Sequence, residues 1–160
     1  MFQHLLIIKA NMNKKYLRID QGTLEEAYEI AKSIKEFDRL YPFTEFENRI
    51  KDVTHLILIA SYKNTPIAFK IGYETLPKKF FYSWIGGVLK KYRKSGVAQR
   101  LIEEQEKWVK ENSYERIMVK TRNRHVGMIN LLRSNNYIEM AKIPYEPDEE
   151  TRLLFEKELN

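Results

Sequence analysis

The chain has 160 residues, of which 43% are apolar and 12% aromatic, and it contains no cysteine. That is enough apolar material for one sizeable core, and the lack of cysteine excludes a disulfide framework, a thiolate nucleophile and Cys-ligated zinc. Lys and Arg outnumber Asp and Glu by 28 to 22, a formal net charge of +6, which favours anionic partners without identifying them.

Membrane insertion and export are not indicated by the sequence. The longest apolar runs, such as residues 5–8 and 56–60, are far shorter than the roughly 20 residues that span a bilayer. The first residues lack the basic region of a signal peptide, and we therefore expect a soluble, cytoplasmic protein. Met12 reads like a natural protein start, so residues 1–11 are expected to be an extension before a single domain over residues 12–160.

The first elements are predicted to be a short strand and two helices. Residues 16–19 alternate as a strand does, and Thr23 and Glu26 then fit the S/T-x-x-E capping box that begins a helix. An apolar stripe of helical period continues from there to about Phe37. A shorter helix is expected over residues 44–51.

A hairpin and a third strand follow. Residues 55–61 and 67–74 are apolar, β-branched runs, and the intervening residues 62–66 contain turn-forming Asn and Pro. Residues 77–79 predict another turn. The next strand, residues 80–89, is apolar on both faces, which indicates burial on both sides.

The second half alternates helices and strands. An apolar face of helical period runs from Val97 to Val109, opposite a charged face. Asn135-Asn136 is a suitable end for a later helix, because Asn tolerates the left-handed conformation. The remaining expected elements are a strand over 116–121, a helix around 128–132, and closing strands over 137–143 and 151–158.

The loop before the long helix has the composition of an anion site. The first amides of a helix lack intrahelical acceptors, the helix dipole adds roughly half a positive charge, and small side chains let a phosphate approach. An ordinary helix N-terminus with a tight turn is the alternative, and neither the Walker A motif nor G-x-G-x-x-G is present. The loop contains small residues at Ser95, Gly96 and Ala98 and basic residues at Lys90, Lys91, Arg93 and Lys94.

This region resembles the GNAT superfamily of acetyl-CoA-dependent N-acetyltransferases. The family's phosphate loop, R/Q-x-x-G-x-G/A after the fourth strand, is matched by Arg93-Lys94-Ser95-Gly96-Val97-Ala98. The resemblance covers residues 56–158 and, more loosely, 16–51. It implies an α/β (α+β) fold: a mixed, mostly antiparallel sheet with a central CoA-binding strand–helix–strand unit and helices on both faces.

The resemblance also implies a cofactor site. Acetyl-CoA would be the co-substrate, its pyrophosphate held by backbone amides of Lys94, Ser95, Gly96, Val97 and Ala98, with Arg93 shaping the loop. The strands ending near Val88 and Thr121 would separate, so that backbone at Gly87 and Val88 pairs with the pantetheine. Tight packing is the alternative explanation for Gly86-Gly87. Asn123 stands where the family often contacts the cofactor, although it also fits a generic turn.

The acid and base groups are harder to identify. Many family members use a carboxylate on the fourth strand and a Tyr in the last helix, and this sequence departs at both, with Leu132 at the Tyr position. Glu74 is the candidate base and Tyr82 the candidate proton donor, against a solvated hairpin Glu and a core Tyr. No metal is expected, because the three histidines are too far apart in sequence for local ligand spacing.

Together these features predict an enzyme that transfers acetyl to a primary amine by direct attack in a ternary complex. The acceptor, a small molecule or a peptide, is left open among polyamine, aminoglycoside, amino acid, protein N-terminus and lysine, and a homodimer is also left open. Nucleic acid and membrane are not expected partners. The alternatives are an acyl-CoA-binding module without turnover and a small basic nucleic-acid-binding protein.

Overall fold

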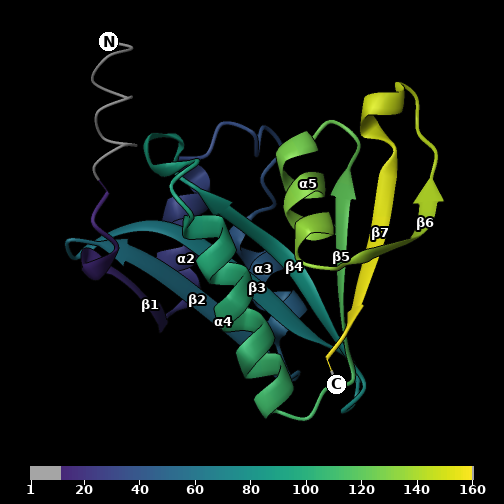
Figure 1. Cartoon of the computed structure of the whole chain (residues 1–160), viewed down its shortest axis with the longest axis horizontal. Helices are drawn as coiled ribbons and strands as arrows, with labels where there is room; N and C mark the ends of the chain where they lie inside the picture. Colours follow the sequence, from purple (N-terminus) through teal and green to yellow (C-terminus); the bar gives the residue numbers. More distant parts are fainter. Residues whose placement is uncertain (1–11, 160) are drawn as a thin grey trace. The chain divides into compact units, whose positions relative to one another are not determined.

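The computed structural model describes residues 12–159 (Figure 1). The predicted extension, residues 1–11, lies outside the described residues. The chain divides into two compact units, the first made of the chain up to Tyr73 with Ile85–Gln105, and the second of Glu74–Trp84 with the chain from Glu106 onward. The prediction of a single domain over residues 12–160 stays a prediction.

Within residues 12–159, seven strands form a mixed sheet with the order β1-β2-β3-β4-β5-β7-β6. β4 and β5 are parallel, whereas β1–β2, β2–β3, β5–β7 and β6–β7 are antiparallel. The predicted mixed α/β fold is confirmed. The strands are β1 (Leu17–Gln21), β2 (His55–Tyr62), β3 (Thr65–Leu76), β4 (Phe80–Val88), β5 (Arg116–Arg122), β6 (Ile138–Ile143) and β7 (Arg152–Glu158).

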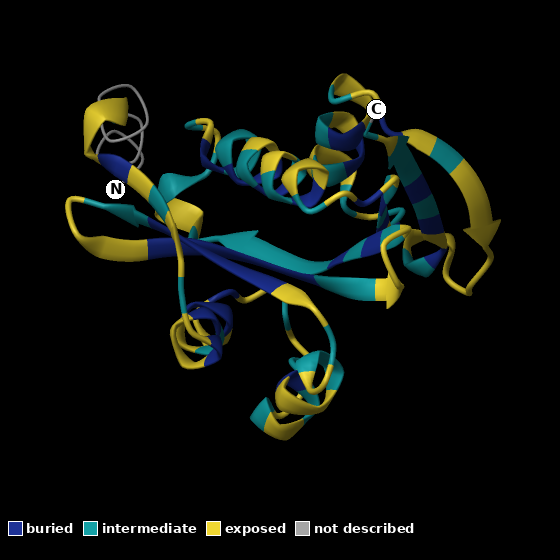
Figure 2. Cartoon of the chain, turned by 90° about the horizontal axis from the view of Figure 1, so that it is seen from below, coloured by how far each residue is buried: buried dark blue, intermediate teal, exposed yellow. Residues whose placement is uncertain are grey.

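The described part of the chain also forms four α-helices and three short 3₁₀ turns. In the first unit, α2 and α3 lie on one face of the sheet and α4 on the other (Figure 2). The helices are α2 (Leu24–Lys32), α3 (Phe43–Ile50), α4 (Val97–Glu111) and α5 (Val126–Ser134), and the 3₁₀ turns are η1 (Lys14–Tyr16), η2 (Lys90–Tyr92) and η3 (Asp148–Glu150).

The capping box at the start of α2 is confirmed. The Glu26 amide donates to Thr23 Oγ1 at 3.2 Å, and the Thr23 amide donates to Glu26 Oε2 at 2.7 Å. The predicted length of this helix is wrong, because α2 ends at Lys32 and not near Phe37. The chain continues in tight turns that keep Ile34 buried and Phe37 against Phe69, with ring centroids 6.3 Å apart. The apolar period therefore reflects packing onto the sheet beyond the end of the helix.

The β2–β3 hairpin is tighter than its turn residues predicted. Lys63 and Asn64 both have positive φ, at 48° and 67°, as a two-residue hairpin turn requires. Pro66 is part of β3, opposite Ser61 and next to a shift in register between Ala60 and Ser61. An irregularity of this kind accommodates proline, which cannot donate to the strand ladder.

Strand β4 is not buried on both faces, contrary to the prediction. Its buried residues are Phe81 and Ser83, and the other seven are partly exposed. The Phe81 ring packs against Trp108 and Tyr114, with centroids 5.5 and 5.4 Å away. The other face of β4 also has aromatic residues, so the sequence shows a continuous apolar run although that face is only partly covered. The run therefore wrongly predicted burial on both faces.

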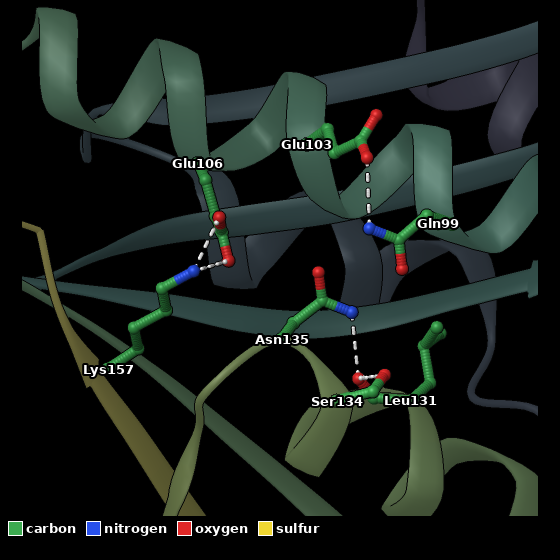
Figure 3. Close-up of polar contacts among 7 residues, drawn as sticks. All are labelled: Gln99, Glu103, Glu106, Leu131, Ser134, Asn135 and Lys157. Atoms are coloured by element: carbon green, nitrogen blue, oxygen red, sulfur yellow. Dashed lines mark hydrogen bonds and ion pairs between the residues drawn. The ribbon is translucent and has the colours of Figure 1, made fainter.

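The end of α5 matches the sequence pattern. Asn136 adopts φ 66°, and the side-chain amide of Asn135 donates to the Leu131 carbonyl at 2.8 Å (Figure 3). This arrangement satisfies carbonyl groups that the last helical turn would leave unpaired. The chain then reverses into β6.

Gly86→Ala is expected to destabilise the fold by about 1–3 kcal/mol, the usual effect of overpacking. A Cβ at this position would lie 2.9 Å from the Phe69 backbone oxygen, which cannot move without disturbing β3. Gly127→Ala is the matched control, because a Cβ there meets nothing within 4 Å and α5 should gain up to about 1 kcal/mol. Urea unfolding measures both values. Equal stability of the two variants would contradict the close packing at Gly86.

Candidate cofactor and active site

The predicted phosphate loop connects β4 to α4 within the first unit. After η2, Lys94 and Gly96 take positive φ values of 58° and 87°, and the Ser95 hydroxyl donates to the Tyr92 carbonyl. The Arg100 amide donates to the Gly96 carbonyl at 3.1 Å and closes the first turn of α4. The amides of Val97 and Ala98, in this first turn, precede the first intrahelical acceptor, as the anion-binding amides of a helix N-terminus do.

The space next to Gly96 is nearly empty of protein atoms. A Cβ at Gly96 would have only Lys14 within 4 Å, with Cε and Nζ each 4.0 Å away. Lys14 belongs to η1, far from the loop in sequence, and no pattern in the sequence indicated that it approaches the loop. Together with Lys90 and Lys94 it surrounds the loop with exposed positive charge.

Arg93, the first residue of the motif, makes three hydrogen bonds within the first unit. Nε donates to the Val88 carbonyl at 2.9 Å, while Nη1 and Nη2 donate to the two Glu36 carboxylate oxygens at 2.6 and 2.9 Å. The hydrogen bonds from Arg93 hold the pKa of the Glu36 carboxyl at about 2. The carboxylate in turn raises the pKa of the Arg93 guanidinium. Sequence reasoning missed Glu36, because an acid 57 positions away carries no local signal.

The end of β4 was predicted to offer backbone groups to the pantetheine. The register of β4 with β5 runs from Phe80–Arg116 to Ser83–Val119, and β4 then continues to Val88. The Leu89 amide donates to the Ile67 carbonyl of β3 at 2.9 Å. Because successive residues of a strand direct their polar groups to opposite edges, those of Val88 point away from β3.

Gly87 is tightly packed, which is the alternative explanation that the sequence analysis gave for the Gly86-Gly87 pair. A Cβ at Gly87 would lie 2.6 Å from Ile34 Cδ1 and 3.3 Å from the Phe37 ring. The segment after α2 therefore packs directly on the last residues of β4. Contact of Gly87 with the cofactor stays a prediction.

Glu74 and Tyr82, the candidate acid–base residues, lie in the second unit. Glu74 Oε1 accepts hydrogen bonds from the Lys78 amide at 3.0 Å and the Tyr114 hydroxyl at 3.2 Å. These bonds give the carboxylate a structural role in the β3–β4 turn. Lys120 Nζ lies 5.7 Å from the centroid of the Tyr82 ring.

The remaining predicted positions of the second unit are held by internal contacts. The Asn123 side chain donates to the backbone and carboxylate oxygens of Asp148 at 3.3 and 3.2 Å, which fits the turn interpretation. Leu132, at the position where many family members have Tyr, is 1% exposed. Burial, with a smaller contribution from Glu106, raises the pKa of Tyr137. Glu106 is itself paired with Lys157 at 2.9 Å (Figure 3).

Two further properties bear on the site. Residues 12–159 contain no group of three or more His, Asp or Glu side chains placed to hold a metal ion. None of the described helices has the length and apolar character that a membrane crossing requires.

Comparison with known protein families identifies the family of the chain. The family model described as "Acetyltransferase (GNAT) family" matches residues 23–137. No curated protein sequence matches the chain.

Solved structures show the same fold. Ribosomal-protein-S18-alanine N-acetyltransferase from Escherichia coli is 15% identical with a TM-score of 0.77, over 89% of this chain and 94% of that one. An aminoglycoside 6'-N-acetyltransferase complexed with coenzyme A is 11% identical with a TM-score of 0.75, over 89% and 97%. The putative acetyltransferase yncA from Salmonella typhimurium, with its cofactor acetyl-CoA, is 10% identical with a TM-score of 0.72, over 91% and 95%. The chain belongs to the GNAT acetyltransferase family.

Proposed function

We propose that the protein is an N-acetyltransferase that moves the acetyl group of acetyl-CoA to a primary amine. The observation that carries this proposal is the loop before α4, where the first turn of the helix begins at Gly96 and a Cβ on Gly96 would meet only Lys14 within 4 Å. Such a site suits a pyrophosphate, and exposed lysines around it suit the other phosphates of CoA. Two of the three solved structures named above hold CoA or acetyl-CoA.

The transfer occurs by direct attack in a ternary complex. The amine nitrogen forms a bond to the thioester carbonyl carbon, the carbon–sulfur bond breaks, and the CoA thiolate leaves. The proton lost by the amine passes to water or a base, and the thiolate takes up a proton. The absence of cysteine from the chain supports direct attack, because no thiolate is available to carry the acetyl group.

Much of the acceleration comes from positioning. Holding amine and thioester in attack geometry removes a large share of the barrier, and a thiolate is a tolerable leaving group at neutral pH. Many family members use a carboxylate and a Tyr for proton transfer. Here the Glu74 carboxylate already accepts two hydrogen bonds, and the Tyr position is the buried Leu132, which supports a reaction without those two groups. Glu74 and Tyr82 remain the candidates for proton transfer.

The acceptor class stays open between small molecules and peptides. Two of the relatives named above are a ribosomal-protein-S18-alanine N-acetyltransferase and an aminoglycoside 6'-N-acetyltransferase. At identities of 11–15% neither acceptor carries over to this chain. A panel of amines is therefore part of the test.

The test combines binding with turnover. Calorimetry should show acetyl-CoA binding, and thiol release should depend on an added amine from a panel of polyamine, aminoglycoside, amino acid and peptide. Binding without amine-dependent release for any amine would favour an acyl-CoA-binding module. Tight, salt-sensitive binding of oligonucleotides without acetyl-CoA binding would favour the nucleic-acid alternative.

Lys14→Ala and Lys94→Ala should each weaken acetyl-CoA binding by about 1 kcal/mol or less, with a smaller loss at high salt. Both side chains are exposed point charges beside the loop. Titrations at low and high ionic strength measure the effect. Lys51→Ala, which removes an exposed charge at the end of α3, is the control. A loss that does not depend on salt would show that the lysine has a structural role.

A further inference from the structure

The guanidinium of Arg93 forms hydrogen bonds with two other segments of the first unit. On one side it holds the Val88 carbonyl at the end of β4, and on the other it forms a two-pronged ion pair with Glu36. Three of its N–H groups therefore point at protein oxygens. A planar, bidentate pair fixes the orientation of the guanidinium as well as its position.

Glu36 is itself held in place by the segment around it. Ile34 is buried, and both Ile34 and Phe37 pack against Gly87. The segment 34–37 is thus attached to the end of β4 by apolar packing and to the phosphate loop by the ion pair. Although the Glu36 side chain is 49% exposed, its backbone is fixed on both sides.

We propose that Glu36 is a positioning residue for acetyl-CoA binding. Glu36 fixes the orientation of Arg93, and Arg93 in turn links the phosphate loop to the end of β4. Arg93 then contributes geometry and not charge to the phosphate site, because its charge is balanced by Glu36. The anion is left to the helix amides and the surrounding lysines. This inference rests on the proposed binding of acetyl-CoA.

The alternative predicts an effect of opposite sign. If Arg93 were a phosphate ligand for which Glu36 competes, removing the Glu36 charge would release Arg93 and tighten acetyl-CoA binding. If Glu36 positions the loop through Arg93, removing that charge weakens binding, even though a negative charge near the phosphates has been lost. Weaker acetyl-CoA binding by the Glu36 variant therefore indicates a positioning role, whereas tighter binding indicates that Glu36 competes with the phosphate for Arg93.

The experiment compares Glu36→Gln with Glu29→Gln by calorimetry with acetyl-CoA. Glu29 is an exposed residue of α2 that pairs with Lys32 and not with Arg93, so its variant makes the same change in net charge without breaking the Arg93 ion pair. Glu36→Gln should weaken binding roughly tenfold, the scale of lost charge-assisted hydrogen bonds, and Glu29→Gln should leave binding unchanged. In turnover assays the KM for acetyl-CoA should rise with little change in kcat.

Two further variants test whether the effect runs through Arg93. Arg93→Lys keeps the charge but cannot form the bidentate pair together with the bond to Val88, so it should bind as weakly as Glu36→Gln. Adding Glu36→Gln to Arg93→Lys should cause little further loss, because the pair acts as one unit. Thermal unfolding checks that each variant is folded, and Glu36→Asp, which keeps the charge, provides a milder second test.

The outcomes are distinct. Failure of the wild type to bind acetyl-CoA would overturn the proposed function itself. Wild-type binding with equal or tighter binding by Glu36→Gln, or full binding by Arg93→Lys, would overturn the positioning role and leave the proposed function intact.

Discussion

Gly96→Glu is expected to reduce acetyl-CoA binding at least a hundredfold, about 3 kcal/mol, in a chain that still folds. The carboxylate would enter the open space at Gly96, at the start of α4, where it would repel the pyrophosphate and compete with it for the first helix amides. It would also lie close to Lys14 and neutralise part of the surrounding positive charge. Calorimetric titration of wild type and variant measures the loss.

Gly96→Ala is the control that separates the effect of the added charge on acetyl-CoA binding from the effect of backbone strain. Gly96 has φ 87°, so any side chain there is strained by about 1–2 kcal/mol, and alanine carries that strain without the carboxylate. Its binding should be much closer to that of the wild type than to that of Gly96→Glu. Equal affinities of wild type and Gly96→Glu would remove the basis for placing the cofactor at this loop.

Acetyl transfer should rise about tenfold per pH unit until the acceptor amine is neutral, because only the unprotonated amine attacks the thioester. A peptide α-amine should level off near pH 8, whereas a lysine-like amine should still be gaining rate above pH 9, since its pKa is about 10.4. The profile of kcat/KM for the amine measures this and helps to identify the acceptor class. A flat profile would contradict attack by a free amine.

Glu74→Gln and Tyr82→Phe test whether a protein group sets that profile. Both variants should keep the pH dependence and lose less than about 10²-fold in kcat, the lower end of what a lost acid–base group causes. Glu36 does not contribute to the profile, because its pKa of about 2 keeps the ion pair with Arg93 intact across this pH range. A thousandfold drop in kcat with unchanged acetyl-CoA affinity would identify a dedicated catalytic residue.

Features that depend on neighbouring residues could be predicted from the sequence. The capping box of Thr23 and Glu26 and the left-handed end of α5 at Asn136 both follow from residue types a few positions apart. The parallel β4–β5 pair around α4 follows from the change of period along the chain. Local hydrogen bonding and side-chain periodicity determine these features, so the sequence alone indicated the family and the cofactor loop.

Features that depend on how distant segments pack required the tertiary structure. Three contacts exist only because the fold brings distant segments together. Glu36 pairs with Arg93, Lys14 lies near Gly96, and the Tyr114 hydroxyl donates a hydrogen bond to Glu74. The end of α2 and the one-sided burial of β4 were mispredicted because an apolar run shows which residues avoid water, not which element covers them. The sequence by itself therefore determined the family and the composition on which the predicted anion site rests. The tertiary structure decided which side chains contact that loop, because ion pairs and burial depend on distance in space.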